Sequence, residues 1–186
     1  MIYEFLAEGF EEIEAVAPLG LFRRVGKSIA DNPRRVLSVG VSGKEVTSAR
    51  GIKITADIEL SEVKLDSSLE MIILPGGLPG VRNLAACEKV KEIIEYCAEN
   101  EIFIGAICAA PSILGQMGLL SGRTATCYPG FEAELTGAVI STDSVVRDGK
   151  YITAKGAGNS VEFALKLVEA LYGEEISKKI SETIQC

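Results

Sequence analysis

The chain has 186 residues, of which 47% are hydrophobic and 24% charged, and we interpret it as a single domain over residues 1–186 with a substantial core. The net charge of −7 disfavours a nucleic-acid-binding protein, which would need a basic face. No apolar run approaches the roughly 20 residues of a membrane span, and the start of the chain carries acids instead of the basic residues of a signal peptide. We therefore expect a cytoplasmic protein with no nucleic-acid and no membrane partner.

Strand-like and helix-like segments alternate along the chain. The hydrophobic pattern predicts strands over residues 2–6, 35–41, 52–54, 71–74 and 102–107, and helices over 11–25, 88–98, 109–119, 160–171 and 174–184. Residues 145–153 carry the Asp-Gly signature of a β-hairpin. We expect Gly26 to cap the first helix, and Asn159 or Ser160, with Glu162, to cap the helix over 160–171.

This alternation predicts an α/β fold, in which helices cover both faces of a mostly parallel sheet. Such sheets bind ligands beyond the carboxyl ends of their strands. Residues 75–77, the sequence Pro-Gly-Gly, and Cys108 each follow an apolar strand directly. We therefore expect them to lie together at that edge of the sheet.

Cys108 stands between a predicted strand and a predicted helix. A helix N-terminus presents free N–H groups and a partial positive charge, which favour thiolate over thiol and predict a lowered cysteine pKa. A sharp turn between a strand and a helix also exposes the side chain, as it does for the serine nucleophile of hydrolases. The alternative is a small buried residue, a common place for cysteine.

Glu14 falls on an apolar stripe of the first predicted helix, among Ile13, Ala17, Leu21 and Val25. An ionised and unpaired carboxylate is costly among apolar neighbours. Burial would raise its pKa, so that Glu14 could stay protonated and donate a hydrogen bond. The alternative is a glutamate at the edge of the stripe that reaches solvent.

Backbone groups and arginines complete the candidate site. The glycines at 76 and 77 allow backbone N–H groups to approach a ligand closely, and with the N–H of Ala109 they could stabilise an oxyanion; an ordinary tight turn is the alternative. Arg24 and Arg50 could bind an anionic group or be solvated surface residues. The chain has five cysteines and no histidine, so we expect no metal site and no cofactor.

These pieces together resemble the DJ-one/ThiJ/PfpI family, especially its deglycase group and the bacterial ThiJ-like members. The resemblance covers nearly the whole chain. It is carried by residues 8–16 (EGFEEIEAV), 73–77 (ILPGG), 106–111 (AICAAP), 126–129 (TCYP) and 155–165 (KGAGNSVEFAL).

The resemblance implies a flavodoxin-like three-layer sandwich, similar to class I glutamine amidotransferases, and a homodimer. Cys108 matches the oxidisable nucleophile of the family at a strained turn, and Glu14 matches the protonated glutamate that hydrogen-bonds the thiolate. Gly77 and Ala109 match the backbone oxyanion donors. Arg24 and Arg50 match arginines near the pocket of some members, and we count Gly76 and Tyr128 as further pocket candidates.

The chain departs from the family where many members carry a histidine near the cysteine, because Tyr128 stands there. A second departure is Ala157, where relatives often have proline. Tyrosine, with a reference pKa near 10, is a poor base at neutral pH. Any proton transfer would therefore have to run through Glu14, while Cys127 could serve as a resolving thiol.

The family's activities leave two functions open. The first is a glutathione-independent glyoxalase or deglycase that acts on methylglyoxal, glyoxal or their thiol and amine adducts. In it the Cys108 thiolate would attack the aldehyde, Glu14 would relay a proton between carbons, and water would release lactate. The second is a non-enzymatic oxidative-stress sensor or chaperone that uses reversible oxidation of Cys108.

Overall fold

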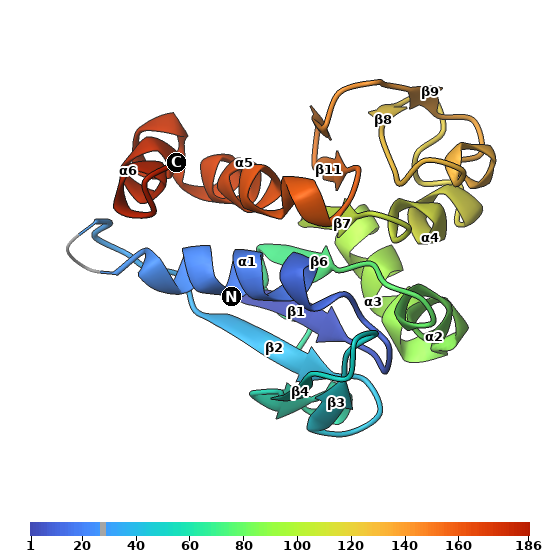
Figure 1. The fold of residues 1–186 in the computed structure, drawn as a ribbon, viewed down its shortest axis with the longest axis horizontal. Coiled ribbons are helices and arrows are strands. Elements are labelled where there is room, and N and C mark those ends of the chain that lie inside the picture. The colour runs from blue at the N-terminus through green and yellow to red at the C-terminus, as the bar shows by residue number, and fades with distance from the viewer. Residues whose placement is uncertain (27–28) are drawn as a thin grey trace.

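The computed structural model describes residues 1–26 and 29–186, and a seven-stranded sheet stands at its centre (Figure 1). The strand order is β10-β11-β7-β6-β1-β2-β5. The strands are β1 (Ile2–Leu6), β2 (Val36–Gly40), β5 (Ile58–Glu59), β6 (Met71–Leu74), β7 (Phe103–Ile107), β10 (Val145–Asp148) and β11 (Tyr151–Ala154). The two apolar strands that precede the candidate site, β6 and β7, are therefore neighbours in the middle of the sheet.

The pairs within this sheet are parallel except at one edge. β6 pairs with β7 so that Ile73 lies opposite Gly105, and β10 pairs antiparallel with β11. The predicted hairpin over 145–153 is thus confirmed, with Gly149 at φ 60° in its turn. Because β6 and β7 run in the same direction, their carboxyl ends meet at one edge, as predicted.

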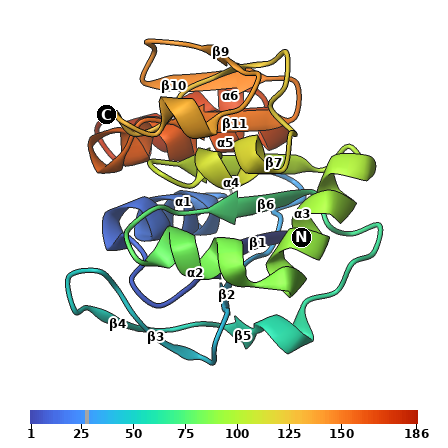
Figure 2. The ribbon, with the colours of Figure 1, turned by 90° about the vertical axis from the view of Figure 1, so that its right-hand side faces the viewer.

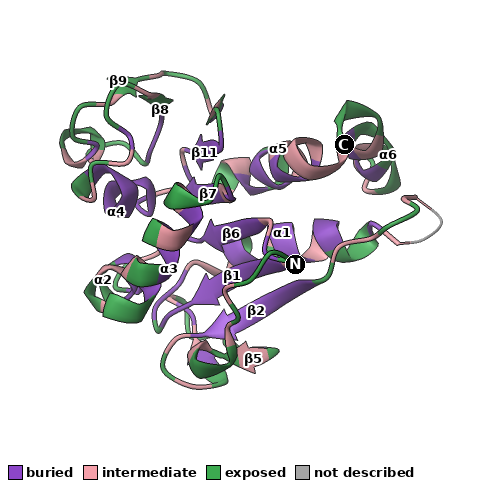
Figure 3. Cartoon of the chain, turned by 180° about the vertical axis from the view of Figure 1, so that it is seen from behind, coloured by how far each residue is buried: buried purple, intermediate pink, exposed green. Residues whose placement is uncertain are grey.

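Helices cover both faces of the sheet (Figure 2). One face packs against α1 (Glu12–Arg24) and α5 (Ser160–Tyr172), and α6 (Glu174–Thr183) packs against α5. The other packs against α2 (Gly80–Ala86), α3 (Glu88–Glu99) and α4 (Pro111–Gln116). The central strands β1 and β6 are buried throughout their length (Figure 3). This arrangement confirms the predicted α/β three-layer sandwich with a mostly parallel sheet.

Several small elements lie outside the main pattern. The strand predicted over 52–54 is β4 (Lys53–Thr55), which pairs with β3 (Glu45–Thr47) in a separate two-stranded sheet. The elements that were not predicted are β3, β5, α2, the pair β8 (Thr124–Ala125) and β9 (Val139–Ile140), and the 3-10 turns Leu60–Glu62, Glu132–Glu134 and Ala157–Asn159. Each is too short for a hydrophobic period to develop. The described helices include none that is both long and apolar enough to cross a membrane.

Three predicted helix details differ from the structure in whole or in part. The helix after Cys108 begins only at Pro111, whose missing N–H suits a first turn, and it ends well before Leu119, with Gly118 at φ 74° just beyond it. Val25 stands at the C-cap of α1, and Gly26 does not adopt a positive φ. Asn159 stands at the N-cap of α5, as one of the two predicted alternatives has it, but its side chain makes no capping hydrogen bond.

Candidate active site

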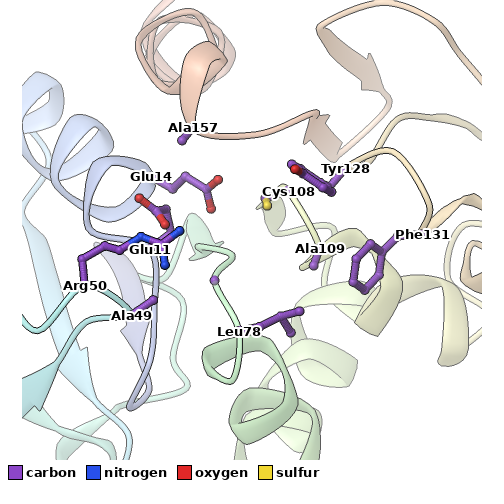
Figure 4. Close-up of a pocket in the computed structure, with 11 residues that line it drawn as sticks. Glu11, Glu14, Ala49, Arg50, Leu78, Cys108, Ala109, Tyr128, Phe131 and Ala157 are labelled. Atoms are coloured by element: carbon purple, nitrogen blue, oxygen red, sulfur yellow. The ribbon is translucent and has the colours of Figure 1, made fainter.

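A cavity of about 470 Å³ opens at the carboxyl ends of β6 and β7. Its lining combines a cysteine, two glutamates, an arginine and a group of apolar and aromatic side chains. The lining residues are Glu11, Glu14, Ala49, Arg50, Gly77, Leu78, Cys108, Ala109, Tyr128, Phe131 and Ala157. The structure therefore brings Cys108 and the glycine loop together, as the strand pattern predicted, and it places Glu14 beside them, as the family resemblance implied (Figure 4).

Cys108 has a backbone conformation that exposes its side chain to this cavity. Its φ is 66°, in the left-handed region that a non-glycine residue adopts only at a cost of about 1–2 kcal/mol. Two hydrogen bonds hold the strained residue: its N–H donates to the Ala154 carbonyl at 2.9 Å, and its own carbonyl accepts from the Tyr128 N–H at 2.7 Å. Strain held in place by its surroundings is typical of a nucleophile at a strand-to-helix turn.

Glu14 is fully buried on the first turns of α1. The Gly76 N–H donates to its Oε2 at 2.8 Å, while Oε1 has no hydrogen-bond partner among the described residues. The prediction that Glu14 is buried is confirmed, but the predicted stripe is partly wrong, because Ile13 is 55% exposed. The buried face of α1 instead includes Ala15, Pro18 and Phe22.

Burial raises the pKa values of both groups. The pKa of Glu14 rises to about 7, because desolvation outweighs the Gly76 hydrogen bond and the contact with the Cys108 thiol. The pKa of Cys108 rises to about 12, because desolvation and the Glu14 carboxylate outweigh the N–H groups of Gly77 and Ala109. Between these two values the pair holds one proton.

The lowered pKa predicted for Cys108 is therefore wrong. The prediction relied on a helix starting at the cysteine, whereas α4 begins at Pro111 and spans only 6 residues. The partial charge of a helix falls off within its first turn. The dominant influences on the thiol are its own burial and the neighbouring carboxylate.

The two glycines of the 75–77 loop have distinct roles. A Cβ at Gly76 would lie 2.5 Å from Glu14 Oε2 and 2.6 Å from the Cys108 Cβ, so only glycine fits between these side chains. Gly77 adopts φ 91°, and a Cβ there would lie 2.4 Å from the Glu11 nitrogen. The Gly77 and Ala109 N–H groups both approach the Cys108 sulfur, where an oxyanion of a bound aldehyde would form.

Of the remaining predicted site residues, some line the cavity and one lies outside it. Tyr128 lines the cavity and is 49% exposed, and its ring lies against the backbone of Gly156. Arg50 also lines the cavity. Arg24 does not: it stands 10 residues beyond Glu14 on α1, a rise of about 15 Å, and borders a separate depression with Val161 and Ile184.

Cys127 does not fit the expected resolving role. It is 4% exposed, packs in the core on the α3 and α4 face, and is not part of the cavity lining. Burial and two nearby glutamates, Glu132 and Glu134, raise its pKa to about 11. Sequence adjacency to Tyr128 was a poor guide, because Tyr128 lines the cavity while Cys127 packs into the core.

Sequence reasoning also missed part of the lining. Glu11, Ala49, Leu78 and Phe131 were not identified, and Ala157 was noted only as a departure from the family. Two of these had a usable signal: Glu11 stands directly before the first helix, three residues before Glu14, and Leu78 directly follows the glycine pair. Phe131 reaches the site through the turn over 128–131, and no hydrophobic periodicity in the sequence predicts this turn.

Comparisons with known proteins agree with this geometry. Residues 1–170 match the model of the DJ-1/PfpI family. The chain is 36% identical over 170 residues to the glutathione-independent glyoxalase DJR-1.2 of Caenorhabditis elegans, covering 90% of this chain and 86% of that protein. It is 37% identical over 178 residues to protein DJ-1 homolog B of Arabidopsis thaliana, covering 95% of this chain but only 39% of that longer protein.

Solved structures show the same fold. A mutant of the DJ-1 superfamily protein STM1931 from Salmonella typhimurium superposes with a TM-score of 0.89 at 31% identity, over 99% of this chain and 97% of that one. Drosophila melanogaster DJ-1beta superposes with a TM-score of 0.88 at 31% identity, over 99% of this chain and 96% of that one. The predicted fold and family are thus both confirmed.

Proposed function

The chain belongs to the DJ-1/PfpI family, and from its site we propose that it is a cysteine-dependent, glutathione-independent glyoxalase acting on methylglyoxal or glyoxal. One observation carries this proposal. A strained cysteine, a buried glutamate with a pKa near neutrality and two backbone N–H groups line one cavity. The proposal is supported by the C. elegans relative that is named for this activity.

The first step is attack of Cys108 Sγ on the aldehyde carbon. A carbon–sulfur bond forms, and the electron pair of the carbonyl moves to its oxygen, which the N–H groups of Gly77 and Ala109 stabilise. The proton shared by the Cys108–Glu14 pair passes through Glu14 to that oxygen. This leaves a hemithioacetal on Cys108 and a carboxylate at Glu14, so the raised pKa of the thiol does not prevent attack.

The second step moves a hydrogen between adjacent carbons. The Glu14 carboxylate removes the proton from the former aldehyde carbon, giving an enediolate, and returns it to the neighbouring carbon, while the hydroxyl proton on the first carbon passes to the oxygen of the second. The first carbon is oxidised to a thioester and the second is reduced to an alcohol, so no external oxidant or reductant is needed. A carboxylate with a pKa of about 7 can both accept and return this proton at neutral pH.

The third step is hydrolysis. Water adds to the thioester carbon, the carbon–sulfur bond breaks, and the thiol recovers its proton through Glu14. The overall reaction is methylglyoxal plus water giving lactate and a proton. No step uses an imidazole, which fits a chain without histidine.

Lactate formation from methylglyoxal in the absence of glutathione tests the proposal. We expect steady turnover by the wild type and a loss of at least about a thousandfold in Cys108→Ser, because the attacking sulfur is gone. Cys127→Ser is the matched control and should retain activity. A folded wild type without turnover would contradict the proposal.

The alternative function, oxidation sensing at Cys108, has less support from the site. Susceptibility to peroxide follows thiolate character and exposure, whereas burial and Glu14 raise the pKa of this thiol to about 12. Mass spectrometry after mild peroxide treatment distinguishes the two functions. Selective oxidation of Cys108 in a protein without glyoxalase turnover would favour the sensor.

We also propose a homodimer that uses an apolar surface on α1 and β4. Ile13, Val16 and Ile52 are each at least half exposed and lie together there. Glu12 and Ile13 border this surface, and Glu14 directly follows them, so a second copy would adjoin the cavity. Light scattering tests this: Val16→Glu should give a monomer if the wild type is a dimer through this surface, and a monomeric wild type would contradict it.

A further inference from the structure

The cavity around Cys108 is large for the simplest substrate. Its volume of about 470 Å³ falls within the range that commonly encloses drug-sized ligands. Methylglyoxal has only a few heavy atoms, and its methyl group would fill little of this space. The site as built therefore has room for an α-oxoaldehyde with a longer substituent.

A second cavity of about 470 Å³ adjoins the first. Leu78 and Phe131 line both cavities and so form the wall between them. Beyond this wall lie the α2 residues Val81, Ala85 and Ala86. A group attached to a substrate at Cys108 would pass these two side chains to enter the second cavity.

Three of the four polar side chains that line the second cavity are hydrogen-bonded within the protein. The Ser112 hydroxyl donates to the Ala109 carbonyl at 2.7 Å, and the Gln116 amide donates to Glu134 Oε2 at 2.7 Å. Arg82 is an exposed residue of α2 at the same cavity. With Ser112 and Gln116 satisfied, the alanines and Val81 offer apolar surface to a ligand.

The first cavity itself separates charge from apolar surface. Figure 4 shows Glu11, Glu14 and Arg50 entering from one side, and Leu78, Phe131 and Tyr128 from the other. We place the aldehyde carbon on Cys108 and its oxygen near Gly77 and Ala109. An apolar substituent on the charged side would displace water from the charged groups, which costs free energy, so an alkyl substituent avoids that side. The substituent therefore points towards Leu78 and Phe131.

We propose that the second cavity is a substituent subsite, and that the enzyme prefers α-oxoaldehydes with a branched or extended apolar chain to methylglyoxal. Leu78 and Phe131 are its specificity-determining residues, since each touches both cavities. This inference rests on the proposed glyoxalase function. Its chemistry is unchanged: the larger aldehyde plus water gives the corresponding α-hydroxy acid.

The test compares kcat/KM for methylglyoxal and isobutylglyoxal, measured without glutathione. We expect the wild type to prefer isobutylglyoxal by about tenfold or more, as buried apolar groups of this size allow. Ala85→Leu extends a side chain into the second cavity and should reduce that preference at least about fivefold, mainly through KM. Ala133→Leu is the matched control: this exposed alanine lies in neither lining and should leave the preference unchanged.

The outcomes separate the two proposals. Turnover of methylglyoxal with no preference for isobutylglyoxal would overturn the subsite but leave the glyoxalase standing. A wild type that turns over neither aldehyde would overturn both. If Ala85→Leu does not fold, Ala86→Leu replaces it, and an unchanged preference in the folded variant would contradict the subsite.

Discussion

Two glutamates in the first 14 residues are both completely buried, yet their surroundings differ. Glu14, on α1, lines the cavity beside Cys108 and accepts a hydrogen bond from Gly76. Glu4, in the middle of β1, lies between Ser38 and Ile73 on the neighbouring strands. Neither Glu4 oxygen has a hydrogen-bond partner among the described residues.

Burial raises the pKa of both carboxyl groups, but different groups oppose the rise in each case. For Glu4, desolvation raises the pKa well above its usual value and only the attraction of Arg23 opposes it. For Glu14, hydrogen bonding by Gly76 and the contact with Cys108 limit the rise to about 7. The comparison teaches that burial alone does not make an acid functional. Glu14 also has a nearby nucleophile, a backbone donor and an open cavity, which allow its proton to be transferred to a bound substrate.

The largest expected effect comes from crowding the functional glutamate. Gly76→Ala would place a Cβ 2.5 Å from Glu14 Oε2 and 2.6 Å from the Cys108 Cβ. We expect a loss of at least about a hundredfold in kcat for lactate formation, since displacements near 1 Å can cost that much. The control is Gly20→Ala within α1, where a Cβ meets nothing within 4 Å; it should keep activity and gain up to about 1 kcal/mol of stability.

Next in size is the pH dependence of kcat/KM. Attack requires that the Cys108–Glu14 pair has lost its first proton, and the pKa for this loss is about 7. We expect kcat/KM for methylglyoxal to fall about tenfold per pH unit below that value and to level off above it. The fall in kcat/KM at low pH should be absent from the residual activity of Glu14→Gln. A wild-type kcat/KM that does not change between pH 5 and 8 would contradict this account.

The smallest effect concerns stability and the buried Glu4. In the unfolded chain Glu4 ionises near pH 4.3, whereas the folded protein keeps it neutral to a higher pH. The folded state thus binds more protons, and its stability falls as pH rises above about 4.3, by up to about 1.4 kcal/mol per unit, until the folded pKa is reached.

Denaturant unfolding at several pH values checks this. Glu4→Leu should raise the free energy of unfolding by at least about 1 kcal/mol at pH 8, with a smaller gain at pH 4. The matched substitution Leu6→Gln, which buries a polar group in the same strand, should destabilise instead. A Glu4→Leu variant less stable than the wild type at pH 8 would show that the carboxyl has a favourable partner.

The sequence predicted the site better than it predicted the environment of its cysteine. Cys108 and the glycine loop follow apolar strands that the pattern identifies directly, and parallel strands bring their carboxyl ends together. The pKa of Cys108 depends on burial and on Glu14, which are tertiary properties. The short extent of α4 was missed as well, although Gly118, which adopts φ 74° just beyond the helix, is a visible stop signal in the sequence.

Glu4 marks another limit of sequence reasoning. It lies in an apolar strand, and alternation alone does not reveal that both faces of β1 are buried. Arg24 shows the reverse error: a resemblance placed it near the pocket, while the length of α1 sets it at the far end. Long strands and helices and the edge where the central strands end were therefore predictable, and the other side-chain neighbourhoods across elements were not.

The most direct test of the central claim is one assay on two matched variants, Glu14→Gln and Glu4→Gln. Each replaces a fully buried carboxyl by an amide of nearly equal size, and lactate formation from methylglyoxal without glutathione is measured for both. We predict a loss of at least about a hundredfold in kcat for Glu14→Gln and a change of less than about threefold for Glu4→Gln. Full turnover by Glu14→Gln, with both variants folded, would contradict the role of Glu14 as the proton carrier.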